Sequence, residues 1–260
     1  LASTKTRVTT TIKDASGTAL NTQVRTVEFD SNGQIAKETD TFGTVKIYTR
    51  DGNMRITREE YWENTGTVTT PNLVLKTATN YTYDAKDNML TRTEAQGTAL
   101  EKTTTYTYHP TFNKVATETV KSVVDPLQNR VITNTYDNAN GNLLTTTETG
   151  LLGNGTPYSY TTTYTYDTSG RIMTIDGPRT DVSDVTTYTY DPITGYLTAV
   201  TQPLVGTTVY SSHDALGNPQ TVTDPNGNAT TYTYDSIGRV LTVKAPGDLN
   251  PTQYVYITAG

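Results

Sequence analysis

A short motif, Tyr-Thr-Tyr-Asp, recurs along this chain and constrains its fold more than any other feature. Complete copies stand at Tyr81–Asp84, Tyr164–Asp167, Tyr188–Asp191 and Tyr232–Asp235, and weakened copies at Val27–Asp30, Tyr106–His109, Asn134–Asp137 and Tyr210–Asp214. The last four acidic positions, Asp167, Asp191, Asp214 and Asp235, follow one another at intervals of 24, 23 and 21 residues. A repeat of this length predicts an array in which each unit contacts mainly its neighbours.

The clearest copy, residues 230–247, reads as a β-hairpin. Tyr232 and Tyr234 are two residues apart and share one strand face, while the intervening threonine points to the other face. Asp235 can accept a hydrogen bond from the backbone N–H two residues on, and Gly238 supplies the positive φ of a type I turn with a bulge. Gly170 has the same offset from Asp167, so both glycines are expected in the left-handed region.

Other copies vary this turn. Asp191–Gly195 and Asp137–Gly141 each carry one extra residue, and Asp87 occupies the glycine slot after Asp84. The run Arg50–Asn53 reads as a contracted hairpin with a two-residue Asp-Gly loop. Thr9–Ile12 and Thr67–Thr70 read as strand in the less regular first part of the chain.

These patterns predict an all-β repeat architecture with consecutive antiparallel hairpins that form a curled or spiralling sheet. About nine hairpins would give roughly 18 strands. No stretch shows the 3.6-residue period of a helix. We expect a single array over residues 1–260, degenerate over 1–75 and clear over 76–260, which is a piece of a longer protein.

The composition supports a thin sheet and excludes several classes of function. Only 33% of the residues are hydrophobic, 19 are tyrosine and none is cysteine. Such a chain cannot bury a thick core, and it has no disulfide scaffold or thiolate chemistry. The net charge of −6 and the absence of a basic run argue against nucleic-acid binding, and no apolar segment is long enough to span a membrane.

The motif resembles the RHS/YD repeat, whose pattern is approximately Tyr-x-Tyr-Asp-x-x-Gly-Arg-[Leu/Val]-x-x-[Val/Thr] followed by a Pro/Gly loop. Residues 232–243 and 164–175 match it nearly throughout. The family occurs in bacterial RHS toxins, toxin-complex C components, wall-associated proteins and animal teneurins. The resemblance implies a hollow β-sheet shell that, in the toxins, encloses a C-terminal effector, and a secreted or cell-surface bacterial location. The autoproteolytic core segment of the toxins has no counterpart here.

We therefore expect a structural wall or scaffold rather than an enzyme, with no catalytic, cofactor or metal site. The expected partners are the rest of its own shell or an enclosed effector. His109 and His213 are interpreted as structural, and turn chemistry explains Asp224–Asn228 better than a calcium loop. The tyrosine pairs are expected to stack across strands as a continuous ladder. The alternative is an adhesin-like module whose tyrosine face binds carbohydrate or protein.

Overall fold

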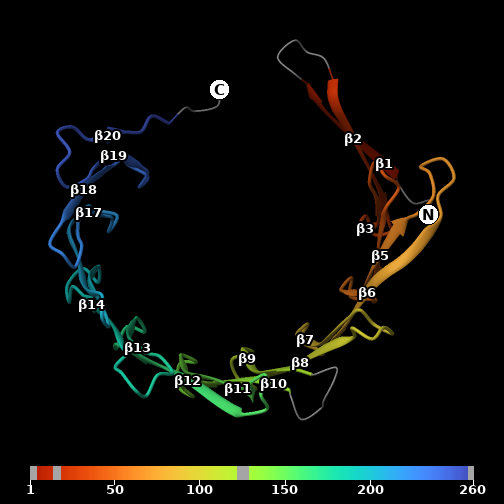
Figure 1. Cartoon of the computed structure of the whole chain (residues 1–260). Coiled ribbons are helices and arrows are strands. Elements are labelled where there is room, and N and C mark those ends of the chain that lie inside the picture. The colour runs from red at the N-terminus through yellow and green to blue at the C-terminus, as the bar shows by residue number, and fades with distance from the viewer. Residues whose placement is uncertain (1–4, 14–18, 122–128, 257–260) are drawn as a thin grey trace. The chain divides into compact units, whose positions relative to one another are not determined.

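The computed structural model describes residues 5–13, 19–121 and 129–256, which form strands and turns without a helix (Figure 1). The chain divides into two compact units, residues 1–132 with 149–158 and residues 133–148 with 159–260. The first nine strands are β1 Lys5–Lys13, β2 Ala19–Phe29, β3 Ile35–Thr39, β4 Val45–Arg50, β5 Ile56–Asn64, β6 Leu73–Tyr83, β7 Met89–Glu94, β8 Lys102–Tyr108 and β9 Val115–Val120. The others are β10 Arg130–Tyr136, β11 Leu143–Leu151, β12 Pro157–Tyr166, β13 Ile172–Asp176, β14 Thr186–Tyr190, β15 Leu197–Gln202, β16 Gly206–His213, β17 Pro219–Thr223, β18 Ala229–Tyr234, β19 Val240–Lys244 and β20 Thr252–Gln253.

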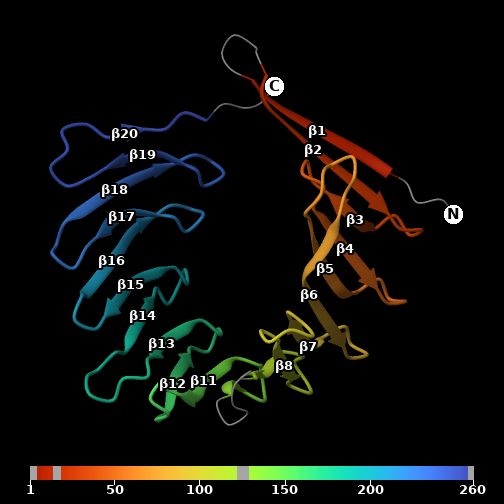
Figure 2. The ribbon, with the colours of Figure 1, turned by 45° about the vertical axis from the view of Figure 1, so that its right-hand side comes forward.

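Each strand pairs antiparallel with the next strand in the chain. In the first unit this holds from β1 through β9, and in the second from β12 through β20, where Figure 2 shows the strands side by side in chain order. The predicted all-β repeat architecture of consecutive antiparallel hairpins is confirmed. The described residues hold 20 strands, slightly more than the estimate from the motif count.

A bulge beside the turn that follows each complete copy of the motif explains the imperfect alternation of the returning strands. Tyr232 lies opposite Val243, but Tyr234 lies opposite Val240, because the register shifts after Thr233. The two valines are therefore three residues apart and still face two tyrosines that are two residues apart. The same shift occurs after Thr165 and Thr189. The bulge keeps the aliphatic side chains of each hairpin on the tyrosine face.

The sheet has almost no closed core. Among the described residues the only buried side chains are those of Val27, Val45, Ala78 and Thr104, besides the glycines Gly43 and Gly141, and the tyrosines of the motif are half-buried. The threonines between the paired tyrosines are exposed on the opposite face. Several of them pair with a threonine hydroxyl on the returning strand, as Thr165 does with Thr174 at 2.6 Å and Thr233 with Thr242 at 2.7 Å. The predicted division into a tyrosine face and a wetter threonine face is confirmed.

The predicted aromatic ladder across strands is wrong. Tyr232 and Tyr234 stack within one strand, with ring centroids 6.3 Å apart. In three hairpins of the second unit the motif tyrosines lie opposite aliphatic residues: Tyr164 and Tyr166 opposite Ile175 and Ile172, Tyr188 and Tyr190 opposite Val200 and Leu197, and Tyr232 and Tyr234 opposite Val243 and Val240. In the first unit Tyr81 and Tyr83 lie opposite Arg92 and Met89, so no facing position in these hairpins carries a second aromatic ring.

Two local predictions in the first 75 residues are also wrong. Residues 67–70 are not strand, because Asn64 and Thr67 hold them in a loop through bonds such as Asn64 Nδ2 to the Thr67 carbonyl at 3.1 Å. The loop at Asp51 is not contracted to two residues. It is the same four-residue turn as elsewhere, since the Met54 N–H donates to the Asp51 carbonyl and Met54 takes the glycine position with φ 67°.

Met54 therefore occupies a backbone region that favours glycine, and replacing it should stabilise the protein. We expect Met54→Gly to raise the free energy of unfolding by about 0.5–1 kcal/mol, since left-handed strain outweighs the extra freedom of glycine in the unfolded chain. The mirror change Gly33→Met, at φ 77° in the preceding Asp turn, should lower it. Urea unfolding of both variants measures this. A lower free energy of unfolding in Met54→Gly would show that the contacts of the methionine side chain contribute more to stability than its left-handed backbone costs.

Candidate functional site: the row of aspartate turns

One edge of each unit carries the turns that follow the tyrosine strands, and we call this edge the Asp-turn row. Its turns begin at Asp30, Asp51, Asp84 and His109 in the first unit and at Asp137, Asp167, Asp191, Asp214 and Asp235 in the second. In antiparallel hairpins the turns alternate between two edges, so every second turn shares an edge. The motif therefore places its most polar residues in a line.

Most Asp turns are closed by the same hydrogen bonds, and the turns at Asp137 and Asp191, which have one extra residue, differ. At Asp167, Oδ1 accepts the N–H groups of Ser169 and Arg171, both at 2.9 Å, and the Gly170 N–H donates to the Asp167 carbonyl at 3.0 Å. Gly170 and Gly238 have φ values of 79° and 83°, so the predicted left-handed glycines are confirmed. Asp87 takes the glycine position in the turn that begins at Asp84, and its φ of 66° lies in the left-handed region, as predicted.

The second carboxylate oxygen binds the side chain that follows the turn. Asp Oδ2 accepts from an arginine Nε in three turns and from an asparagine Nδ2 in three others. The pairs are Asp51–Arg55 at 2.8 Å, Asp167–Arg171 at 2.7 Å, Asp235–Arg239 at 2.6 Å, Asp84–Asn88 at 2.8 Å, Asp214–Asn218 at 2.9 Å and Asp224–Asn228 at 2.9 Å. The first five belong to the Asp-turn row, and the last closes a turn at the opposite edge. These carboxylates are saturated by donors from their own turns.

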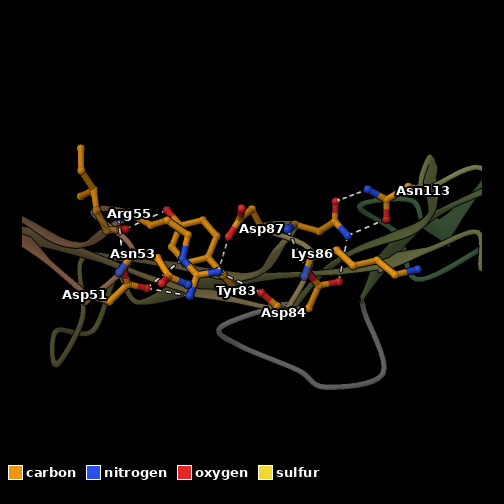
Figure 3. Close-up of polar contacts among 10 residues, drawn as sticks. Asp51, Asn53, Arg55, Tyr83, Asp84, Lys86, Asp87 and Asn113 are labelled. Carbon is orange, nitrogen blue, oxygen red and sulfur yellow. Dashed lines mark hydrogen bonds and ion pairs between the residues drawn. The ribbon is translucent and has the colours of Figure 1, made fainter.

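The arginines also connect neighbouring hairpins. Arg55 donates from Nη1 to the Asp84 carbonyl at 2.9 Å and to Asp87 Oδ1 at 2.8 Å in the next turn of the row (Figure 3). Its guanidinium carbon lies 4.9 Å from the centroid of the Tyr83 ring. Figure 3 shows the row continuing to Asn113, which exchanges amide hydrogen bonds with Asn88 at 2.7 and 2.9 Å.

The second tyrosine of each motif completes this connection. The Tyr83 hydroxyl donates back to the carbonyl of Ile56, the residue that follows Arg55, at 2.7 Å. We call this arrangement the clasp. It consists of the side chain that follows one Asp turn and the tyrosine hydroxyl of the next repeat, which donates a hydrogen bond to the backbone carbonyl of the residue after that side chain. The other clasp bonds run from Tyr108 to Met89, Tyr166 to Leu143, Tyr190 to Ile172, Tyr234 to Pro219 and Tyr256 to Val240, at 2.7 to 3.0 Å.

The clasp includes an arginine over a tyrosine ring in both units. The Arg171 guanidinium carbon lies 4.5 Å from the Tyr190 centroid, and that of Arg239 lies 4.3 Å from the Tyr256 centroid. Such cation–π contacts stabilise by roughly 0.5–1 kcal/mol at exposed sites. Burial raises the pKa of Tyr83, Tyr166 and Tyr190 above the ordinary value, so their hydroxyls remain neutral donors at neutral pH.

At two positions a residue other than tyrosine makes the contact between neighbouring hairpins. Arg50 stands in the tyrosine slot and donates from Nη1 to the Ile35 carbonyl at 2.6 Å, as a tyrosine hydroxyl does elsewhere. His213 also stands in that slot, and its ring lies tilted by 40° against that of Tyr196, which occupies the arginine slot of the preceding turn, with ring centroids 5.3 Å apart. His213 therefore makes a structural contact between hairpins.

The bonds within the Asp turns predict a specific acid sensitivity. The side chain after the turn lowers the pKa of Asp51, Asp84 and Asp214 from its ordinary value, through Arg55, Asn88 and Asn218. When the pKa of an aspartate is lower in the folded than in the unfolded state, its full stabilisation is present above the pKa in the unfolded state, about 3.9. That stabilisation is lost as the pH falls through the pKa in the folded state. Urea unfolding between pH 6 and 2.5 should show a steep loss of stability only below about pH 4. A flat profile in that range would contradict the turn bonds.

Within the part of the chain that the structure describes, no group of three or more His, Asp or Glu side chains is placed to hold a metal ion. The same residues include no helix with the length and hydrophobicity needed to cross a membrane. The contacts of the motif described above connect neighbouring hairpins. The sequence identified the turn aspartates and glycines but missed the bridging role of Arg55, Arg171 and Arg239.

Comparison with known proteins agrees with this repeat. The chain aligns with the TcdB2–TccC3 structure with a TM-score of 0.56 and 16% identity, over 88% of this chain and 13% of that one. Structures of TcdB2–TccC3 with Cdc42 and of a Photorhabdus luminescens Tc holotoxin pore align with TM-scores of 0.43 and 0.42 at 17% identity, over 88% and 92% of this chain. This chain covers 14% of each of them. No curated protein sequence matches.

The family model described as RHS Repeat matches residues 213–248, which contain the clearest copy of the motif. That copy shows the Asp turn, the bulge and the clasp tyrosine that recur in other hairpins. The fold is that of the TcdB2–TccC3 structure over most of the chain. The resemblance to the RHS repeat that the motif indicated is therefore confirmed, with the family model matching residues 213–248.

Proposed function

We propose that this RHS-repeat array is a non-enzymatic wall of a secreted or cell-surface bacterial protein, and that the wall encloses a C-terminal effector. The observation that carries the proposal is the clasp. Each hairpin bonds the next one through a tyrosine and the side chain after the turn, so the stabilising contacts run along the array. Residues are used to extend a surface rather than to assemble a reactive centre.

The composition of the two faces supports this role. A single sheet with few buried side chains exposes both faces over its whole area. The tyrosine face presents aromatic and branched side chains, whereas the threonine face presents hydroxyls. A wall with one amphipathic face and one polar face suits a container whose contents differ from the surrounding water. The chain spans only 13% of the TcdB2–TccC3 chain, so a curled and closed wall needs more repeats than this chain holds.

Limited proteolysis of the natural protein that contains this array tests the enclosure. The region C-terminal to the array should resist protease while the array is intact. It should be cut faster when the clasp is removed by Arg171→Ala with Tyr190→Phe. Thr189→Ala, a matched change on the opposite face, should leave the cutting rate unchanged. Equal cutting rates in the unmodified protein, the double variant and Thr189→Ala would contradict the proposed enclosure. They would not contradict the structural role of the array.

A second candidate function, carbohydrate binding, rests on one concavity in the first unit. It has a volume of about 610 Å³ and lies over β1 to β5. Phe42 and Tyr61 line it and are 76% and 38% exposed. Lys46 lies directly opposite Tyr61 in the strand register. Exposed aromatic rings beside polar side chains that can donate hydrogen bonds are common features of sugar-binding sites.

The surroundings of the concavity support an adhesin-like role at this position. Arg25 and Glu38 line it as an ion pair of 2.7 Å, and the side chains of Gln23 and Lys46 also line it. A glycan array probed with the chain would test this function. Tyr61→Ala and Phe42→Ala should abolish any retained sugar, and Tyr254→Ala, an exposed tyrosine elsewhere, should not. Absence of binding by the unmodified chain would exclude the candidate.

A further inference from the structure

Four turns of the array carry an Asn-Gly pair as their last two residues. The pairs are Asn32–Gly33, Asn140–Gly141, Asn154–Gly155 and Asn226–Gly227. The glycines have positive φ values of 77°, 75°, 81° and 84°, and each glycine N–H donates to the carbonyl of the first residue of its turn. Glycine has no Cβ to keep its nitrogen away from the preceding side chain, so an asparagine before glycine is the one most open to attack on its amide. These turns therefore present the same reactive pair on nearly the same backbone.

In two of these turns an aspartate binds the N–H group that follows the glycine. The Asn228 N–H donates to Asp224 Oδ1 at 2.8 Å, and the Gln34 N–H donates to Asp30 Oδ1 at 2.9 Å. This is the bond that closes the Asp turns of the array, and it directs the N–H toward the aspartate rather than toward the asparagine side chain.

The turn between β11 and β12 begins with Leu152, and there the same N–H binds the asparagine itself. The Thr156 N–H donates to Asn154 Oδ1 at 3.0 Å. The ring that this bond closes includes the Gly155 nitrogen, so the amide carbon of Asn154 and the nitrogen that could attack it are held in one short ring. Asn154 and Gly155 are exposed, and a Cβ at Gly155 would meet no atom within 4 Å, so water and base can reach the pair.

We propose that Asn154 is a site of spontaneous modification, at which water replaces the side-chain amide and the asparagine becomes aspartate or isoaspartate. The Gly155 nitrogen gives its proton to a base in the solvent and forms a bond to Cγ of Asn154. The Cγ–Nδ2 bond then breaks, and the nitrogen takes up a proton from water and leaves as ammonia. A water molecule opens the resulting succinimide at either of its two carbonyl carbons. The Thr156 N–H stabilises the oxyanion of the attack, since a hydrogen bond to a charged oxygen is stronger than one to a neutral oxygen.

The turn that begins at Asp137 combines both arrangements. The Asn142 N–H donates to Asn140 Oδ1 at 2.8 Å, whereas Nδ2 of Asn140 donates to Asp137 Oδ2 at 3.3 Å. The bond to the aspartate holds the nitrogen that has to leave. We therefore expect this pair to react more slowly than Asn154.

The modification should open one end of the β11–β12 hairpin. The Gly155 N–H donates to the Leu152 carbonyl and the Leu152 N–H donates to the Thr156 carbonyl, both at 2.8 Å. Isoaspartate places an extra carbon atom in the main chain between these donors and acceptors and adds a negative charge. The two bonds that close the turn cannot both keep their geometry. Residues 149–158 should therefore exchange their amide hydrogens faster after the reaction.

The chain supplies an internal comparison, and one substitution transfers the Asp turn to the reactive site. The folded chain is kept at mildly alkaline pH, and the mass of proteolytic peptides reports the conversion of each asparagine. We expect Asn154 to convert about fivefold faster than Asn226, the rate factor that one hydrogen bond supplies. Leu152→Asp, which provides an acceptor for the Thr156 N–H, should lower the rate at Asn154 to that at Asn226. Leu152→Glu adds the same charge on a longer side chain and should leave the rate high.

Unfolding provides the second control. In concentrated urea the turns are lost, so Asn154 and Asn226 should convert at equal rates. A difference that persists in urea would overturn the proposal, because it would come from the local sequence and not from the turn. Equal rates in the folded chain, an unchanged rate in Leu152→Asp, or an equal decrease in Leu152→Glu would also overturn it. Unchanged hydrogen exchange of residues 149–158 in the isoaspartate form would overturn the opening of the hairpin. None of these results depends on whether the array encloses an effector or binds a sugar.

Discussion

Replacing Tyr190 with alanine should lower the free energy of unfolding by about 2–3 kcal/mol. A tyrosine buries up to roughly 200 Å², and half of that area at about 25 cal/mol per Å² gives most of the loss. The variant also removes the hydrogen bond to the Ile172 carbonyl at 3.0 Å and the ring under Arg171. Thr189→Ala on the exposed face should change stability by less than about 0.5 kcal/mol. Urea unfolding of the two proteins gives both values.

A third variant separates the ring from its hydroxyl. Tyr190→Phe keeps the packing against Leu197 and the contact with Arg171 but loses the bond to Ile172. It should cost about 1 kcal/mol, the usual contribution of one hydrogen bond. If Tyr190→Ala and Thr189→Ala shift the unfolding midpoint equally and by little, the tyrosine face does not stabilise the array. The face would then be available as a recognition surface.

The sequence predicted the local structure of a repeat because that structure depends on residues close together. The carboxylate of Asp235 binds N–H groups two and four residues on, and Gly238 is needed three residues on. These offsets are fixed by turn geometry and recur with the motif. The turn at Asp51 was misread because the Asp-Gly pair suggested a two-residue loop. The strand pairing instead retained the four-residue turn and placed Met54 in the strained position.

The clasp could not be predicted in the same way. Arg55 meets Tyr83, Arg171 meets Tyr190 and Arg239 meets Tyr256, at separations of 28, 19 and 17 residues. The separations differ chiefly because the strands differ in length: β5 and β6 have 9 and 11 residues, whereas β13 and β14 have 5 each. A contact between repeats therefore has no constant spacing to reveal it. The expected tyrosine ladder failed for a related reason, since the bulge in each returning strand sets which side chain lies opposite Tyr234.

The last prediction concerns two glycines with the same backbone and different neighbours. Gly217 and Gly227 have φ values of 87° and 84°. A Cβ at Gly227 would meet no atom within 4 Å, whereas a Cβ at Gly217 would lie 2.8 Å from Cε1 of Tyr196. Gly227→Ala should therefore cost only the left-handed strain of about 1–2 kcal/mol. Gly217→Ala should cost roughly a further 1–3 kcal/mol for overpacking, measured as the difference in unfolding free energy.

The additional loss of unfolding free energy in Gly217→Ala should come from the contact between hairpins and not from the turn itself. Tyr196 belongs to the preceding turn and reaches over Gly217, and its hydroxyl donates to the Ala215 carbonyl at 3.2 Å. Shortening that side chain should therefore remove the clash. In a double-mutant cycle, Gly217→Ala combined with Tyr196→Ala should cost less than the sum of the two single changes by about 1–3 kcal/mol. Additive costs, or equal costs for Gly217→Ala and Gly227→Ala, would show that stacking of turns along the row contributes nothing to stability.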